Sequence, residues 1–213
     1  MRSETKFIVG IIVVTIALII GGVFFLGKSK PQATEAVVDK TELTQNAKNV
    51  LGEQTAKVQI IEFGDYQCPA CAQAQPILNK ILENNKDKVY FAFRHYPLPQ
   101  HKNAREAAYF AQSAANQGKF WEMHNMLYEN QNEWKDSDKA KEVFTGYAQK
   151  IGLDLEKLNQ DLDGVKGIVD QDFSDGNKLG VDSTPTFFIN GQKYPGVIAE
   201  SQFQDIINRE SQK

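Results

Sequence analysis

The only two cysteines of this 213-residue chain stand three positions apart, in the sequence Cys68-Pro69-Ala70-Cys71. An apolar run at 58–63 precedes them, and a helix-compatible run at 72–82 follows. Side chains at this spacing lie on the same side of the first turn of a helix, within the Cα separation of about 4.4–6.8 Å that a disulfide requires. The unpaired N–H groups and positive dipole end of that turn favour a thiolate. The motif therefore predicts a redox-active pair of thiols.

The two cysteines are expected to play different parts. Cys68, at the helix N-terminus, is the predicted nucleophile and the more exposed sulfur, with a pKa in the range of about 3.5–7.5. Cys71, one turn into the helix, is the predicted buried resolving thiol. Pro69 suits the first helical turn, where its missing N–H costs nothing, and it fixes the turn that presents Cys68.

Two other interpretations of the motif stay open. An inert structural bridge is one, although such a bridge rarely opens a helix in this way. A zinc site is the other, but the chain has no second CxxC and no HxxxH pattern. Its further ligands would have to be two of the three histidines, which are otherwise expected to support the fold: His95, His101 and His124.

The elements that must hold this pair can be predicted from the apolar pattern. A strand at 57–63, a helix beginning at the motif and an aromatic strand at 89–93 form a βαβ unit with parallel strands. Residues 103–162 have helical periodicity, with punctuation at Gly118 and Gly152, and another helix is expected at about 164–178. A strand at 186–189, the turn Asn190-Gly191, a return strand at 192–195 and a helix at 199–209 complete the chain.

Residues 7–26 contain no charge and are long enough, at about 30 Å as a helix, to cross a bilayer. We expect an uncleaved anchor after a cytoplasmic tail at 1–6, with a cleaved signal peptide as the alternative, because Leu26-Gly27-Lys28 is a poor cleavage site. Residues 27–50 are predicted to be a polar tether, and residues 51–213 the folded domain. The net charge of −3 and the lack of a basic stripe argue against nucleic acid as a partner.

Four stretches of the chain resemble the DsbA-like thiol–disulfide oxidoreductases of the thioredoxin superfamily. They are residues 57–71 (KVQIIEFGDYQCPAC), 93–98 (FRHYPL), 120–131 (FWEMHNMLYENQ) and 180–191 (GVDSTPTFFING). The resemblance implies an α/β thioredoxin-like fold, βαβ then ββα around a central sheet, with an inserted helical subdomain at about 102–178. Together with the apolar stretch at 7–26, it points to a membrane-anchored bacterial member.

The resemblance also assigns further site residues. Pro185 is expected to be cis and to lie beside the cysteines, while Thr184 offers its backbone to a substrate strand and its hydroxyl to Cys68. Glu62 matches the acid that precedes the nucleophile by six residues and could accept the proton of Cys71; a surface acid at the strand end is the alternative. Ala70 departs from the family, whose best-known members have histidine there, so the thiolate should be less stabilised.

The function that the resemblance implies is an extracytoplasmic enzyme that donates the Cys68–Cys71 disulfide to reduced secreted or surface proteins. It implies a membrane reoxidase of the DsbB or VKOR type as partner, a monomeric state, and no cofactor or metal. A tethered reductase or isomerase of the same fold is one alternative, and a non-enzymatic metal-binding module is another. Asp65 and Tyr66 border the redox turn and are candidates for substrate contact.

Overall fold

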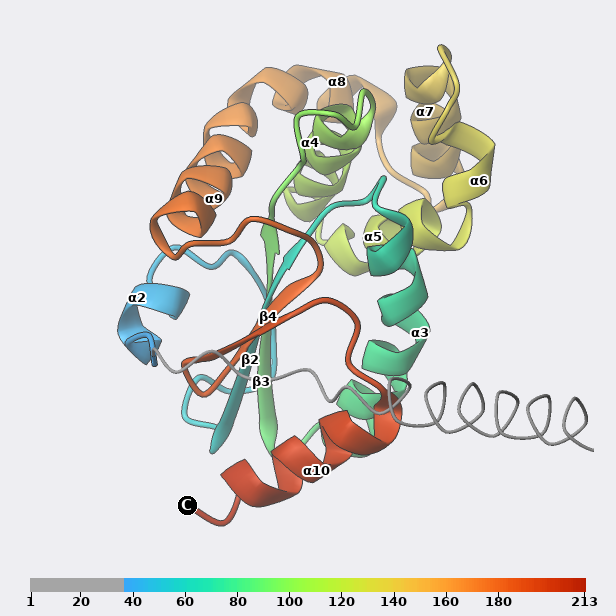
Figure 1. The fold of residues 1–213 in the computed structure, drawn as a ribbon. Helices are drawn as coiled ribbons and strands as arrows, with labels where there is room; N and C mark the ends of the chain where they lie inside the picture. The colour runs from blue at the N-terminus through green and yellow to red at the C-terminus, as the bar shows by residue number, and fades with distance from the viewer. Residues whose placement is uncertain (1–36) are drawn as a thin grey trace, which may run out of the picture. The chain divides into compact units, whose positions relative to one another are not determined.

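The computed structural model describes residues 37–213. Within this range five strands form one mixed sheet in the order β1-β3-β2-β4-β5 (Figure 1). Their bounds are Asn49–Leu51 (β1), Val58–Gly64 (β2), Val89–His95 (β3), Thr186–Ile189 (β4) and Gln192–Pro195 (β5). The central strand β2 is parallel to β3 and antiparallel to β4. The predicted parallel pair and the predicted terminal hairpin are therefore confirmed.

The described helices fall into two groups along the chain. Three belong to the sheet units: α2 (Lys40–Thr44), α3 (Pro69–Asn84) and α10 (Glu200–Glu210). Six more lie between β3 and β4: α4 (Ala104–Ala115), α5 (Phe120–Glu129), α6 (Gln131–Trp134), α7 (Ala140–Lys150), α8 (Leu155–Gly164) and α9 (Lys166–Lys178). Gly118 and Gly152 follow α4 and α7 with φ of 71° and 78°, a conformation in which glycine readily ends a helix.

Both faces of the sheet are buried, which explains why its strands read as continuous apolar runs. Alternate side chains of β2 and β3, such as Ile60 and Phe93, pack with α3, α5 and α10. The intervening side chains, such as Ile61 and Phe63, pack with residues of α2 and α9 on the other face. Figure 1 shows α2 and α9 on one side of the strands and α3 on the other.

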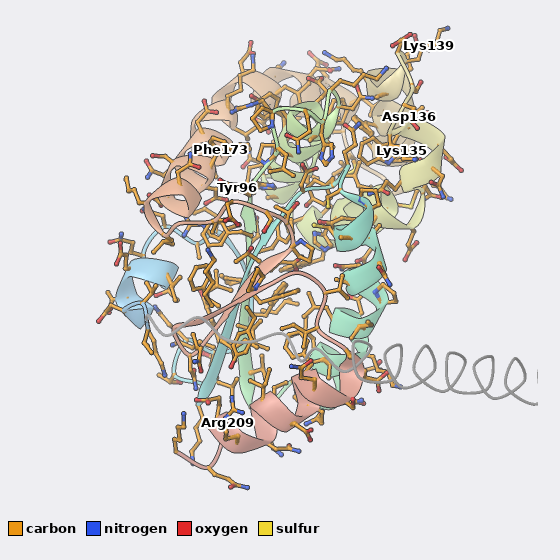
Figure 2. The ribbon with its side chains drawn as sticks, in the orientation of Figure 1. Tyr96, Lys135, Asp136, Lys139, Phe173 and Arg209 are labelled. Atoms are coloured by element: carbon orange, nitrogen blue, oxygen red, sulfur yellow. The ribbon has the colours of Figure 1, made fainter. Side chains whose placement is uncertain are left out.

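Helix α9 is fastened to its face of the sheet by a buried ion cluster and an aromatic stack. Arg94 of β3 donates from Nη2 to Asp175 Oδ2 at 2.7 Å, and its Nε pairs with Asp172. Tyr96, just after β3, stacks on Phe173 of α9 with ring centroids 4.7 Å apart (Figure 2). These contacts hold α9, the last of the six helices between β3 and β4, against β3; these six helices, α4–α9, form the central helical block.

The predicted boundary between tether and domain is wrong. Val37 forms a β-bridge with Gln192, α2 buries Leu43 on the sheet, and β1 pairs with β3. Residues 37–50 are therefore part of the folded domain, because Leu43 fills apolar space on the α9 face and β1 extends the sheet. The predicted anchor at 7–26 and the tail at 1–6 lie outside the described residues. Among residues 37–213, no helix is long and apolar enough to cross a membrane.

Candidate active site

The two cysteines lie where the central strand passes into the first long helix. Residues 65–67 follow β2, Cys68 is the N-cap of α3, and Pro69 occupies its first turn. Both cysteines are free thiols. Cys68 is 7% exposed and Cys71 is completely buried, so Cys68 is the sulfur that a substrate can reach.

The surroundings of Cys68 stabilise its thiolate. Its pKa is lowered to about 5, first by a hydrogen bond from Cys71, against the cost of burial, and then by the Thr184 hydroxyl and the N–H groups of Cys71 and Ala70. This is the effect of a helix N-terminus on an anion. Cys68 is therefore largely ionised at neutral pH.

The pKa values of Cys71 and Glu62 are raised, in contrast to that of Cys68. Burial, the hydrogen bond to Cys68 and the charge of Glu62 raise the pKa of Cys71 well above its usual value. Burial, together with the charge of Cys68, raises the pKa of Glu62 to about 8. Glu62 is 1% exposed, which excludes the surface-acid alternative. The result is a buried thiol and a buried carboxyl that are both protonated at neutral pH.

Glu62 has an apolar setting on the α3 face of the sheet. Its register partners are Phe93 of β3 and Phe187 of β4. Its Oε2 has no hydrogen-bond partner among the described residues, and neither has the buried hydroxyl of Tyr128. Few hydrogen bonds and no cation offset the cost of burying the Glu62 carboxylate among the described residues, so the protonated form is favoured.

The loop before β4 brings the second predicted motif to the cysteines. The Thr184-Pro185 peptide bond is cis, as the resemblance implies. Cys68 Sγ donates to the backbone oxygen of Thr184 at 3.3 Å, although the two residues are 116 positions apart. Within the described part of the chain, the Thr184 hydroxyl has no hydrogen-bond partner of ordinary geometry, so it is free to donate to a Cys68 thiolate. Ala70 is half-buried and contributes only its backbone N–H.

Asp65 and Tyr66, the candidates for substrate contact, are each only 1% exposed. Asp65 accepts hydrogen bonds from the N–H groups of Gln67 and Leu98 and from His101 Nδ1, at 2.7, 2.8 and 2.7 Å. It closes the redox turn and ties it to the loop after β3. An aspartate two residues before a turn N–H is a recognised turn former, a signal that the sequence did contain.

The other two histidines belong to the core. His95 and His124 are fully buried, and burial lowers their pKa values to about 4 and about 3. His95 Nε2 lies 3.1 Å from Gln112, and His124 Nδ1 lies 3.1 Å from the Tyr66 hydroxyl. The expected fold-supporting role fits all three histidines. Over residues 37–213, no three His, Cys, Asp or Glu side chains are grouped so that they could hold a metal ion.

The comparisons with known proteins agree with this geometry. A thioredoxin family model matches residues 44–209. A thioredoxin-like oxidoreductase from Silicibacter pomeroyi DSS-3 is 29% identical, with a TM-score of 0.70 over 83% of this chain and 99% of its own. BdbD from Bacillus subtilis and alpha-DsbA1 from Wolbachia pipientis share the fold, each with a TM-score of 0.72 and with identities of 24% and 23%. They cover 85% and 82% of this chain, and 100% and 96% of their own.

The curated relatives are larger proteins. A Na(+)/H(+) antiporter NhaA 1 from Salinispora arenicola is 34% identical over 167 residues, which are 76% of this chain and 25% of the antiporter. The chain thus spans about a quarter of the length of the curated relatives it matches. The family model covers most of the chain and includes both cysteines and Pro185. The chain therefore belongs to the thioredoxin family.

Proposed function

We propose that this enzyme donates a Cys68–Cys71 disulfide to reduced proteins outside the cytoplasm. The observation that carries the proposal is the contrast between the two sulfurs: the pKa of Cys68 is about 5, whereas that of Cys71 is well above normal. A stabilised Cys68 thiolate favours the reduced enzyme and makes Cys68 a good leaving group. Both effects drive the disulfide from the enzyme to its substrate.

The transfer takes two displacements. A substrate thiolate attacks Cys68 Sγ, the Cys68–Cys71 bond breaks, and Cys71 leaves with the electron pair and takes up a proton. A second substrate thiolate then attacks the substrate sulfur of the mixed disulfide and expels Cys68 as a thiolate. The substrate gains one disulfide and loses two electrons, which remain on the reduced pair.

Glu62 is suited to carry the proton of Cys71. With a pKa of about 8 it is mostly protonated at neutral pH, so it can supply a proton when Cys71 departs. In the reverse direction, when the pair is reoxidised, its carboxylate accepts the same proton. Burial beside Cys71 keeps bulk water from doing this directly.

The cis-Pro185 loop supplies the docking surface in this proposal. Pro185 has no N–H of its own, and the backbone at Thr184 lies beside Cys68. An extended substrate segment can pair with that backbone and so place its thiolate in line with Cys68. The Thr184 hydroxyl then stabilises the thiolate that is expelled.

The remaining parts of the proposal rest on the resemblance and on residues 1–36. The apolar stretch at 7–26 anchors a monomer whose redox domain faces the outside, and a quinone-linked membrane partner of the DsbB or VKOR type reoxidises it. No cofactor is needed, because the disulfide itself carries the electrons. Fractionation should find the full chain in the membrane, with residues 51–213 open to external protease. A soluble product beginning near residues 27–36 would show a cleaved signal instead.

The direct test is the oxidation of a reduced, unfolded protein by the purified disulfide form. We expect one substrate disulfide per enzyme, no activity in Cys68→Ala, and accumulated mixed disulfides in Cys71→Ala, because its resolving thiol is missing. Full activity of Cys68→Ala would refute the proposal. Absence of adducts in Cys71→Ala would mean that the two sulfurs have been assigned the wrong roles.

The reduction potential of the couple decides the direction of electron flow. A donor of disulfides should lie nearer to DsbA, at about −120 mV, than to thioredoxin, at about −270 mV. A value at the thioredoxin end would favour the tethered reductase or isomerase. Tightly bound copper or zinc in the purified protein would favour the metal-binding module.

A further inference from the structure

Side-chain amides join the redox turn, residues 65–68, to helix α6 of the central helical block. Gln131, the first residue of α6, donates from Nε2 to the backbone oxygens of Tyr66 and Cys68 at 2.7 and 3.0 Å. Gln67, inside the turn, donates in return to the backbone oxygen of Lys135 at 2.7 Å. Lys135, which is labelled in Figure 2, directly follows α6. The turn and α6 are thus joined by reciprocal hydrogen bonds.

The position of Gln131 is itself well determined. Trp134, in the same helical turn, is fully buried, donates from Nε1 to the backbone oxygen of Leu127 at 3.0 Å and packs edge-on against Phe144. The Gln131 side chain is buried in turn, with 6% exposure. The packing of Trp134 therefore fixes α6, and with it the direction from which the Gln131 amide reaches the backbone oxygens of Tyr66 and Cys68.

The backbone oxygen that Gln131 contacts is the one that sets the start of α3. The oxygen of Cys68 also accepts the first helical hydrogen bond, from Ala72 N at 3.2 Å. This carbonyl belongs to the same helical turn as the N–H groups of Ala70 and Cys71, which hydrogen-bond to Cys68 Sγ.

We propose that Gln131 is a positioning residue for Cys68: by holding the Cys68 and Tyr66 backbone oxygens, it fixes the turn that presents the nucleophile to its stabilising N–H groups. The inference rests on the proposed role of Cys68 as the attacking sulfur. It assigns to the helical block a share in the redox chemistry, beyond covering the sheet.

The test compares three substitutions in the full chain. Gln131→Met keeps the length of the side chain but removes both donors, and Gln131→Glu also adds a negative charge. Gln112→Met is the matched control, because Gln112 is also buried and its side chain hydrogen-bonds to Asn49 and His95 on β1 and β3 rather than to the backbone of the redox turn. The Cys68 pKa is read from thiolate absorbance against pH, and the reduction potential from equilibrium with glutathione.

We expect the Cys68 pKa to rise by about half a unit in Gln131→Met and by about one unit in Gln131→Glu, with a lower reduction potential in the same order. Gln112→Met should lose stability without moving either quantity. Unchanged pKa and potential in both Gln131 variants would overturn the inference and leave Gln131 a structural residue. If Gln131→Met fails to fold, Gln131→Asn decides, because it keeps a neutral amide but is one methylene too short to hold both oxygens.

This result is separable from that of the proposed function. A native Cys68 thiol that titrates only above neutral pH would remove the basis of the disulfide-donor proposal. A native pKa near 5 that the Gln131 variants do not shift would remove only the role of Gln131.

Discussion

Within residues 37–213, the two faces of the central sheet each bury acidic side chains, but only the α9 face supplies them with a counter-ion. On the α9 face, Asp172 and Asp175 pair with Arg94, and Asp175 also accepts from Asn46 at 2.9 Å. On the α3 face, Glu62 stands among aromatic rings with one oxygen unpartnered. The contrast separates acids that hold the fold from an acid that is available for chemistry.

The pKa values follow from this difference. Burial raises the pKa of Asp172 to about 6 against the attraction of Arg94, so it is still ionised at pH 7. Burial opposes ionisation of Asp175 too, but hydrogen bonds from Asn46 and Arg94 outweigh it and lower the pKa. Nothing comparable offsets the burial of Glu62, whose pKa of about 8 leaves it protonated. The paired acids are fixed as ions, whereas Glu62 can change its charge near neutral pH.

The largest effect on stability should come from removing the counter-ion on the α9 face. Arg94→Met would leave two buried carboxylates without their counter-ion, and we expect a loss of about 3–5 kcal/mol in the free energy of unfolding. Urea denaturation measures it. Adding Asp172→Asn and Asp175→Asn should recover part of the loss, because the stranded charges are then removed. A loss below about 1 kcal/mol would mean that the cluster does not fasten α9.

Removing the unpaired acid should have the opposite sign. Unfolded, Glu62 ionises near 4.5, and folded near 8, so the folded state holds the extra proton and stability falls as pH rises between these values. Glu62→Gln should therefore stabilise the protein by roughly 3 kcal/mol at pH 7 and remove this slope. The measurement is unfolding free energy from pH 4 to 8. A destabilised variant would show that Glu62 has a partner when ionised.

The same substitution should slow the chemistry. If Glu62 carries the proton of Cys71, then Glu62→Gln should reduce the rate of thiol–disulfide exchange at pH 7 by about tenfold to a hundredfold. Stopped-flow kinetics with a reduced peptide would measure it, with Asp172→Asn as a control on the other face. An equal slowing in both variants would point to a general loss of structure rather than to proton transfer.

The smallest effect concerns Ala70, the second of the two residues between the cysteines. Ala70→His would add a partly charged donor near Cys68, and such a hydrogen bond is worth about 1.5–3 kcal/mol. We expect the Cys68 pKa to fall by on the order of one unit and the reduction potential to rise by a few tens of millivolts. Titration against glutathione measures the potential. No rise would mean that Thr184 and the helix N-terminus already supply all the stabilisation that the thiolate can use.

Local sequence determined the redox motif and the elements around it. The CxxC spacing, the proline in the first helical turn and the apolar strands depend on neighbours within a few residues, so the amino-acid sequence alone predicts them. Alternation along 58–64 also placed Glu62 on a buried face. The start of the domain could not be predicted in this way, because the polar stretch before residue 51 is held by a single buried leucine, Leu43, and by edge pairing to β3.

Only the tertiary structure decided which charged groups form ion pairs and which backbone oxygens accept hydrogen bonds at the site. Glu62 and Arg94 are both ionisable residues in buried strands, and the period-2 pattern of the sequence gives no way to tell them apart. Arg94 finds its acids on α9, 78 and 81 residues later, whereas no described segment brings a cation to Glu62. Likewise, Thr184 and Gln131 reach Cys68 from 116 and 63 residues away. Such contacts depend on how whole elements pack, since short-range spacing carries no information about a partner so distant in the chain.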